Sequence, residues 1–144
     1  MTKVKQITVF VENAEGKLSD ITAVLAENEI NIRALSIADT TDFGILRMIV
    51  QDPEKALYVL ATNDIMVKAT EVLVAEISDK PAGLNKALSL LKDAEVALEY
   101  LYAFATKHED KAYVVLKTDN GEAAEAALTA GGVRVLSAKE VYAL

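Results

Sequence analysis

Cysteine is absent from the 144-residue sequence, and basic residues are outnumbered by acidic ones. Without cysteine there is no disulfide, thiolate metal site, iron–sulfur ligand set or thiol nucleophile. The formal net charge is −7 and the isoelectric point is about 4.7. A phosphate backbone or an anionic membrane selects for clustered lysine and arginine, so we expect neither nucleic acid nor membrane as a partner.

Long hydrophobic runs are missing at the start of the chain. The first apolar stretch, Ile7 to Val11, is shorter than the core of a signal peptide and far shorter than a membrane span. Together with the lack of cysteine, this pattern predicts a cytoplasmic protein.

Catalytic groups are scarce. The only histidine, His108, lies in the polar turn KHEDK, where a solvated surface residue is far commoner than a catalyst or a metal ligand. Asp39 and Asp42 suit a turn, and Glu109 and Asp110 are adjacent in sequence and point different ways. Neither a nucleophile elbow nor a Gly-rich phosphate loop occurs. The sequence therefore predicts no catalytic residue, no metal site, no cofactor and no enzymatic activity.

The sequence does contain an internal repeat. Shifted against itself by 66 residues, the chain shows the same order of apolar strand, turn loop and amphipathic helix, with strand and helix periodicities in register. The strand residues Ile7, Val9 and Val11 fall on Leu73, Ala75 and Ile77, and the helical residues Leu18, Ile21, Val24 and Leu25 fall on Leu84, Ala87, Leu90 and Leu91. The repeat predicts two domains, residues 1–69 and 70–144.

Each half has the element order of a ferredoxin-like domain. In the first half the patterns predict strands at 5–11, 30–38, 44–51 and 65–69 and helices at 19–28 and 53–63. In the second half they predict strands at 71–77, 95–105 and 112–118, helices at 85–93 and 121–130, and a final strand within 133–144. The order βαββαβ predicts an α+β fold of two antiparallel four-stranded sheets, each with both helices on one face.

The loops before the first helix of each half, ENAEGKL and SDKPAGL, occupy equivalent positions and allow two interpretations. In the structural interpretation, Asn13 and Asp79 cap a helix or form a turn, and Pro81 starts a helix. Gly16 and Gly83 relieve local crowding. In the functional one, free N–H groups at the helix start bind a carboxylate, and glycine lets a small ligand approach the backbone.

The segments VENAEGKL, INIRALSIADTTDFGILRMIV, DKPAGL and EYLYAF resemble the stand-alone tandem ACT-domain proteins, and the resemblance spans nearly the whole chain. ACT domains are ferredoxin-like regulatory modules that bind amino acids at interfaces between paired domains. The ligand-binding residues that this resemblance implies are Asn13, Ala14, Glu15, Gly16, Lys17, Leu18, Asn31, Ile32, Asp79, Lys80, Pro81, Ala82, Gly83 and Leu84.

Three departures from that family's pattern bear on the predicted sites. Glu15 stands where a proline is usual, Ala82 precedes Gly83 rather than following it, and Ala97 and Leu98 stand where Asn–Ile is common. The sequence therefore leaves open which of the two loops is the occupied site.

The resulting prediction is a non-catalytic regulatory protein that binds a free amino acid, acting as a sensor or as a regulatory subunit of amino acid metabolism. Loop N–H groups would hold the ligand carboxylate, and carbonyls with Asn13 or Asn31 would hold its ammonium group. The alternative is a structural interaction or dimerisation module without ligand. A regulated enzyme is a further expected partner.

A homodimer is also expected from the strand that follows the first helix of each half. Its apolar residues exceed what one side of such a strand can bury, so some must meet another surface. These residues are Leu35, Ile37, Tyr100, Tyr102 and Phe104.

Overall fold

The computed structural model describes residues 3–12, 14–39, 43–106 and 108–144, which form two compact units. One unit comprises Lys5–Thr70 with Ala143, and the other comprises Glu71–Tyr142 with Lys3, Val4 and Leu144. The strand β4 (Val67–Ser78) begins in the first unit and ends in the second. A boundary between residues 69 and 70 would lie inside this strand, and it stays a prediction.

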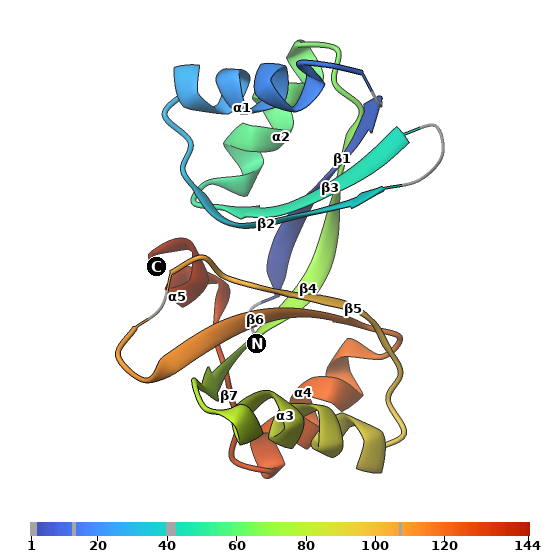
Figure 1. Cartoon of the computed structure of the whole chain (residues 1–144), viewed down its shortest axis with the longest axis vertical. Helices are drawn as coiled ribbons and strands as arrows, with labels where there is room; N and C mark the ends of the chain where they lie inside the picture. Colours follow the sequence, from blue (N-terminus) through green and yellow to red (C-terminus); the bar gives the residue numbers. More distant parts are fainter. Residues whose placement is uncertain (1–2, 13, 40–42, 107) are drawn as a thin grey trace. The chain divides into compact units, whose positions relative to one another are not determined.

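The unit Lys5–Thr70 is built on an antiparallel sheet with the strand order β2-β3-β1-β4. Figure 1 shows both of its helices on one face of β1, β2 and β3. Its elements before β4 are β1 (Val4–Glu12), α1 (Lys17–Glu27), β2 (Ile32–Asp39), β3 (Phe43–Val50) and α2 (Pro53–Thr62).

The core of this unit lies between the sheet and its helices. Because side chains alternate along a strand, Ile7, Val9 and Val11 share one face of β1, and they cluster with Ile21 and Leu25 of α1. Full burial of a side chain of this size contributes about 1.5–3 kcal/mol. The apolar residues that recur every second position in the strand thus pack against those that recur with the helical period in α1, and both sets belong to one core.

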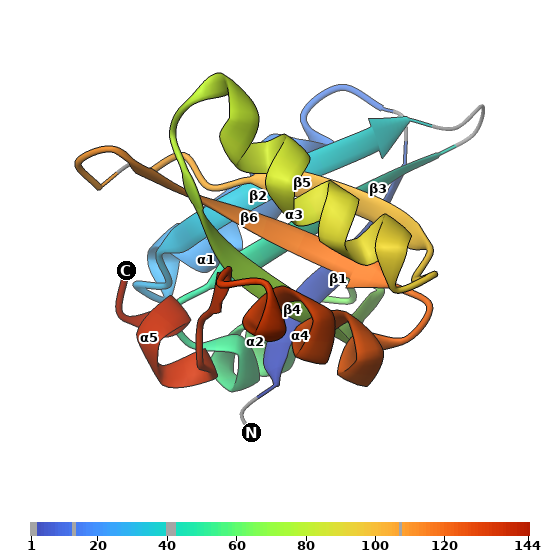
Figure 2. The same ribbon diagram turned by 90° about the horizontal axis from the view of Figure 1, so that it is seen from below.

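The unit Glu71–Tyr142 repeats the arrangement with the strand order β5-β6-β4-β7. Its core cluster includes Ala75, Leu91, Leu116 and Leu128. Figure 2, drawn from the side of α3 and α4, shows both helices over the same face of β5 and β6. Its elements after β4 are α3 (Pro81–Asp93), β5 (Leu98–Ala103), β6 (Lys111–Thr118), α4 (Gly121–Ala130), β7 (Arg134–Val135) and α5 (Ala138–Tyr142).

The end of the chain differs from the prediction of one final strand. Only Arg134 and Val135 pair with β4, and the chain then turns into α5. The backbone N–H of Ser137 donates to Glu140 Oε1 at 3.0 Å, and the N–H of Glu140 donates to Ser137 Oγ at 3.2 Å. This reciprocal pair is a capping box, which favours a helix start over a continued strand.

Both units thus have the βαββαβ order with helices on one face, and the predicted ferredoxin-like α+β fold is confirmed. None of the helices in the described part of the chain is long and apolar enough to cross a membrane.

Candidate functional site

The first predicted loop leads directly into α1, which begins at Lys17, two residues before the predicted start. Gly16 is the N-cap and has a left-handed φ of 80°, a conformation that favours glycine. An added Cβ at Gly16 would meet nothing within 4 Å, so the backbone angle and not crowding accounts for the glycine. The predicted capping residue Asn13 lies outside the described residues.

The start of α1 has no side-chain cap among the described residues. Three other helices do: Asp52 Oδ1 accepts from Lys55 N at the start of α2 and Asn120 Oδ1 accepts from Ala123 N at the start of α4, each at 3.1 Å, and Ser137 Oγ accepts from Glu140 N at the start of α5. Lys17 N already donates to Ala14 O at 3.4 Å, and no side-chain cap from the described residues reaches the N–H groups that follow it in the first turn. The helix dipole favours a negative charge there.

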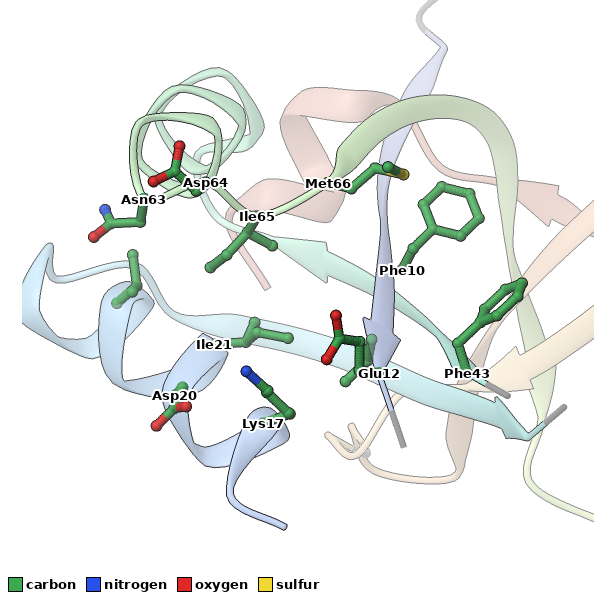
Figure 3. A pocket seen from close by; sticks show the side chains of 12 residues that line it. Phe10, Glu12, Lys17, Asp20, Ile21, Phe43, Asn63, Asp64, Ile65 and Met66 are labelled. Carbon is green, nitrogen blue, oxygen red and sulfur yellow. The ribbon is translucent and has the colours of Figure 1, made fainter. Parts of the chain in front are cut away.

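A cavity of about 720 Å³ lies beside this helix start, within the unit Lys5–Thr70. Its walls come from the end of β1, the first turns of α1, the start of β3 and the connection between α2 and β4. Figure 3 shows Phe10, Phe43 and Met66 together on one side of this space and Ile21 opposite Ile65, whereas the polar ends of Asn63 and Asp64 are turned away from it. The lining residues are Phe10, Val11, Glu12, Lys17, Asp20, Ile21, Val24, Phe43, Asn63, Asp64, Ile65 and Met66.

Two aromatic rings form part of the apolar wall. Phe10 and Phe43 meet edge to face, with ring centroids 6.3 Å apart and an interplanar angle of 63°. The β1–β3 register places Phe43 opposite Glu12, which brings residues more than thirty positions apart to one end of the sheet. Met66 is 70% exposed. An apolar ligand group could cover this surface and remove it from water.

Charged groups line the cavity from several elements: Lys17 and Asp20 lie on α1, Glu12 ends β1, and Asp64 lies between α2 and β4. Lys17 is the one basic residue of the lining, and Glu12, Asp20 and Asp64 are the acidic ones. Within the described ranges, Lys17 makes no ion pair with these carboxylates. A single ammonium near several carboxylates and an apolar wall suits a small molecule that carries both charges and an apolar group.

Lys17 is the predicted site residue that lines this cavity. Asn31 and Ile32 line a separate depression of about 420 Å³ near the end of α1, and Asn31 N donates to Gln51 Oε1 at 2.8 Å. Ala14 precedes Lys17 by three positions and Leu18 follows it directly, and neither is part of the lining. The cavity therefore includes one end of the predicted first site and omits Asn31.

The second predicted loop is largely the first turn of α3. The N-cap is Lys80 and not Asp79, whose backbone N–H donates to Asp110 O at 2.6 Å. A Cβ at Gly83 would lie 1.9 Å from Ser78 O, so the close approach at this glycine is made by the chain itself. This gives the glycine an internal reason, and the expectation that it leaves backbone open to a ligand stays a prediction. Pro81, Ala82 and Leu84 continue the same helix.

The residues that sequence reasoning missed are the aromatic pair and segment 63–66. Asn63 is the C-cap of α2, and Asp64 follows with a positive φ of 60°. The cluster Thr62, Asn63, Asp64 was a visible turn signal, but its position beside α1 depends on tertiary structure. His108 is exposed in its turn, as expected, and Asp42 lies outside the described residues.

Comparisons with known proteins agree with this fold. The sequence profile of a family described as an ACT domain pair matches residues 1–143. A crystal structure of a Bacteroides thetaiotaomicron protein is 37% identical to this chain, covers 99% of it and 98% of its own length, and has a TM-score of 0.93.

More distant solved structures share the fold. The ligand-free regulatory subunit of aspartate kinase from Thermus thermophilus has a TM-score of 0.64 at 14% identity, over 92% of this chain and 94% of its own. The corresponding subunit from Thermus flavus has a TM-score of 0.59 at 16% identity, over 91% and 94%. No curated protein matches the sequence.

Proposed function

The chain belongs to the ACT domain pair family, and on this premise we propose that it is a non-catalytic regulatory protein whose first unit binds a free amino acid. The observation that carries the proposal is the lining of the cavity beside α1. Lys17, the carboxylates and the aromatic wall match, respectively, the carboxylate, the ammonium and the side chain of one amino acid.

Each part of the ligand has a proposed partner. The ligand carboxylate binds Lys17 and the uncapped N–H groups at the start of α1. The ligand ammonium binds Glu12 or Asp20, whose acceptors are near Lys17 in the same lining. The cavity volume of about 720 Å³ lies within the usual range of about 300–1,000 Å³ for small-molecule sites.

An apolar ligand side chain fits the remaining wall. Phe10, Phe43 and Met66 offer apolar surface and no hydrogen-bonding group that would select a polar side chain. An acidic side chain would meet like charge from the three carboxylates. We therefore place apolar amino acids ahead of acidic ones as ligands.

The ligand would act by stabilising one arrangement of the protein over another. Because a non-catalytic sensor needs a second molecule whose activity it changes, a regulated enzyme is a proposed partner, and the cytoplasm is the proposed location. A dimerisation module without ligand remains the second candidate, and the exposure of Leu35 and Ile37 on the edge strand β2 favours it.

A thermal-shift screen of the full chain against the twenty amino acids tests the proposal. At about one hundred times its dissociation constant, a ligand that binds only the folded state adds roughly 2.7 kcal/mol to the free energy of unfolding. At least one apolar amino acid is expected to raise the melting temperature, and calorimetry should give a matching affinity. If no amino acid does either, the dimerisation module replaces the sensor.

A further inference from the structure

At the buried position that ends β3 in one unit and β6 in the other, the two units differ in polarity. Val50 ends β3 and pairs with Ile32, and Thr118 ends β6 and pairs with Leu98. Val50 is fully buried in the core of its unit. Thr118 is only 5% exposed, and its Oγ1 has no hydrogen-bond partner within the described part of the chain.

This hydroxyl is unfavourable for the protein alone. Valine and threonine have nearly the same shape, so the second unit carries a polar group where the first keeps an apolar one. A buried hydroxyl without a partner loses its hydrogen bonds to water and gains none in return. An unpaired group of this kind in a native structure requires an explanation, and a partner from outside the chain supplies one.

Thr118 lines a cavity of about 470 Å³ in the unit Glu71–Tyr142 and its N-terminal extension. Thr118 shares the helix-covered face of β6 with Leu116, which lines the same cavity. Figure 1 shows α4, which supplies another wall, following the end of β6. The lining residues are Lys3, Glu71, Val72, Leu73, Leu116, Lys117, Thr118, Asp119, Asn120, Gly121, Glu122 and Glu125.

The two lysines of this lining are already paired. Lys3 Nζ lies 3.3 Å from Glu71 Oε2, and Lys117 Nζ lies 2.9 Å from Oε2 of Glu99, a residue outside the lining. The side chain of Asp119 is also engaged, because its Oδ1 accepts from Ala97 N at 3.0 Å. Neither lysine is left to neutralise the remaining carboxylates of the lining.

Glu122 and Glu125 are those remaining carboxylates. They are three residues apart on α4 and therefore share one side of the helix. Neither makes an ion pair or a hydrogen bond through its side chain among the residues that the structure describes, and Glu125 is half-buried. The N-terminus of α4 offers little compensation, because Asn120 already caps it and Glu122 lies in its first turn.

We propose that this cavity binds a small organic molecule through a protonated amine. The ammonium group donates hydrogen bonds to the carboxylates of Glu122 and Glu125 and to Thr118 Oγ1, which fills the three donors of the group. The carbon chain of the ligand lies on Leu73, a partly buried apolar residue of the lining.

Other ligand classes fit the lining less well. An anion would meet uncompensated carboxylates. A metal ion would need a cluster of ligands, and the described residues contain no group of three acidic or histidine side chains arranged to hold one. The site is independent of the proposed amino acid cavity, which lies in the other unit.

Butylammonium chloride is the test ligand, with 1-butanol and sodium chloride at equal ionic strength as controls. Amide chemical shifts of the full chain, followed by NMR, are expected to change saturably for butylammonium at residues 116–125. Butanol, which keeps the carbon chain but lacks the charge, should bind at least about tenfold more weakly, because a hydrogen bond to a charged group is stronger than one between neutral groups.

Two variants link the binding to the named groups. Thr118→Val should weaken butylammonium binding severalfold and raise the melting temperature, because it restores the apolar residue found at Val50. Glu125→Gln should weaken binding about tenfold or more, because it removes a charge-assisted hydrogen bond. Thr129→Val, on the exposed side of α4, and Glu27→Gln, on α1, are matched controls that should leave the affinity unchanged.

Three results would overturn the proposal: no saturable shift with butylammonium, equal binding of butanol, or unchanged affinity in Thr118→Val. The last result would assign the hydroxyl to a bound water. A Lys17→Met variant should bind butylammonium normally, so failure of the amino acid proposal and failure of this one remain distinguishable.

Discussion

Lys17 is the residue on which the proposed amino acid site depends most, because it is the one basic side chain of the cavity lining. Lys17→Met keeps the aliphatic length and removes the charge, so affinity for the amino acid should fall about tenfold or more. Stability should change by less than about 0.5 kcal/mol, because the side chain is exposed. Lys139→Met, at an exposed position of α5, is the control. Calorimetric affinities that are equal for both variants would contradict the proposed role of Lys17.

The glycine at position 83 is explained by close packing within the chain itself. Gly83→Ala would place a Cβ 1.9 Å from the backbone oxygen of Ser78, and the start of α3 must shift to relieve the clash. We expect urea denaturation to show a loss of about 2–3 kcal/mol. Gly121→Ala, where a Cβ meets nothing within 4 Å, is the control and should change stability by less than about 1 kcal/mol. Similar losses in the two variants would argue against the close approach.

At the scale of elements, Glu76 of β4 links its strand to β6 and β7 and, through Arg134, to α5. Its carboxylate lies 3.2 Å from Lys111 Nζ of β6 and 2.9 Å from Arg134 Nη1 of β7, and Arg134 also pairs with Glu140 of α5. The hydrogen bond and charge of Glu76 raise the pKa of Lys111 above its usual value. The end of the chain is thereby tied to the sheet.

Glu76→Gln should therefore destabilise the second unit. The side chain of Glu76 is only 12% exposed, but both cations are about half exposed, so screening by water limits the loss to about 1 kcal/mol. Glu99→Gln removes a more exposed single pair and should cost less than about 0.5 kcal/mol. Urea midpoints of the two variants provide the comparison, and a larger loss for Glu99→Gln would contradict this account of the network.

The elements were largely predictable from the sequence, because strands and helices that face a core carry periodic apolar residues. The helix α5 was missed although its cap is local: the reciprocal bonds of Ser137 and Glu140 end the strand after Val135. The site was less predictable. Phe10 and Phe43 meet through the register of two strands, which a loop motif does not contain.

At the scale of the whole molecule, self-association is the main expectation. Leu35 and Ile37 are 47% and 53% exposed on β2, an edge strand of the sheet in the first unit. A second copy that pairs with this edge would cover both side chains and satisfy its free backbone groups. Light scattering at micromolar concentration should give a mass of about 31 kDa, twice the 15.5 kDa of one chain.

An edge variant checks that this surface forms the dimer. Ile37→Lys should return the mass to 15.5 kDa, because the new charge would be buried without a partner. Tyr58→Lys, at a 71% exposed position of α2, should leave the dimer intact. A wild-type chain that remains at 15.5 kDa with and without amino acid would mean that the units leave no surface for a second copy.

The passage of β4 from one unit to the other has a consequence for the lifetime of the protein. A protease must thread an extended segment without hydrogen bonds through its active site, and residues 73–78 of β4 are held in a ladder with β6. The twelve residues Val67–Ser78 contain no loop at which the two units could be cut apart. Limited digestion should therefore not release the units from one another through this connection, and a cell that removes the protein removes both units in one event.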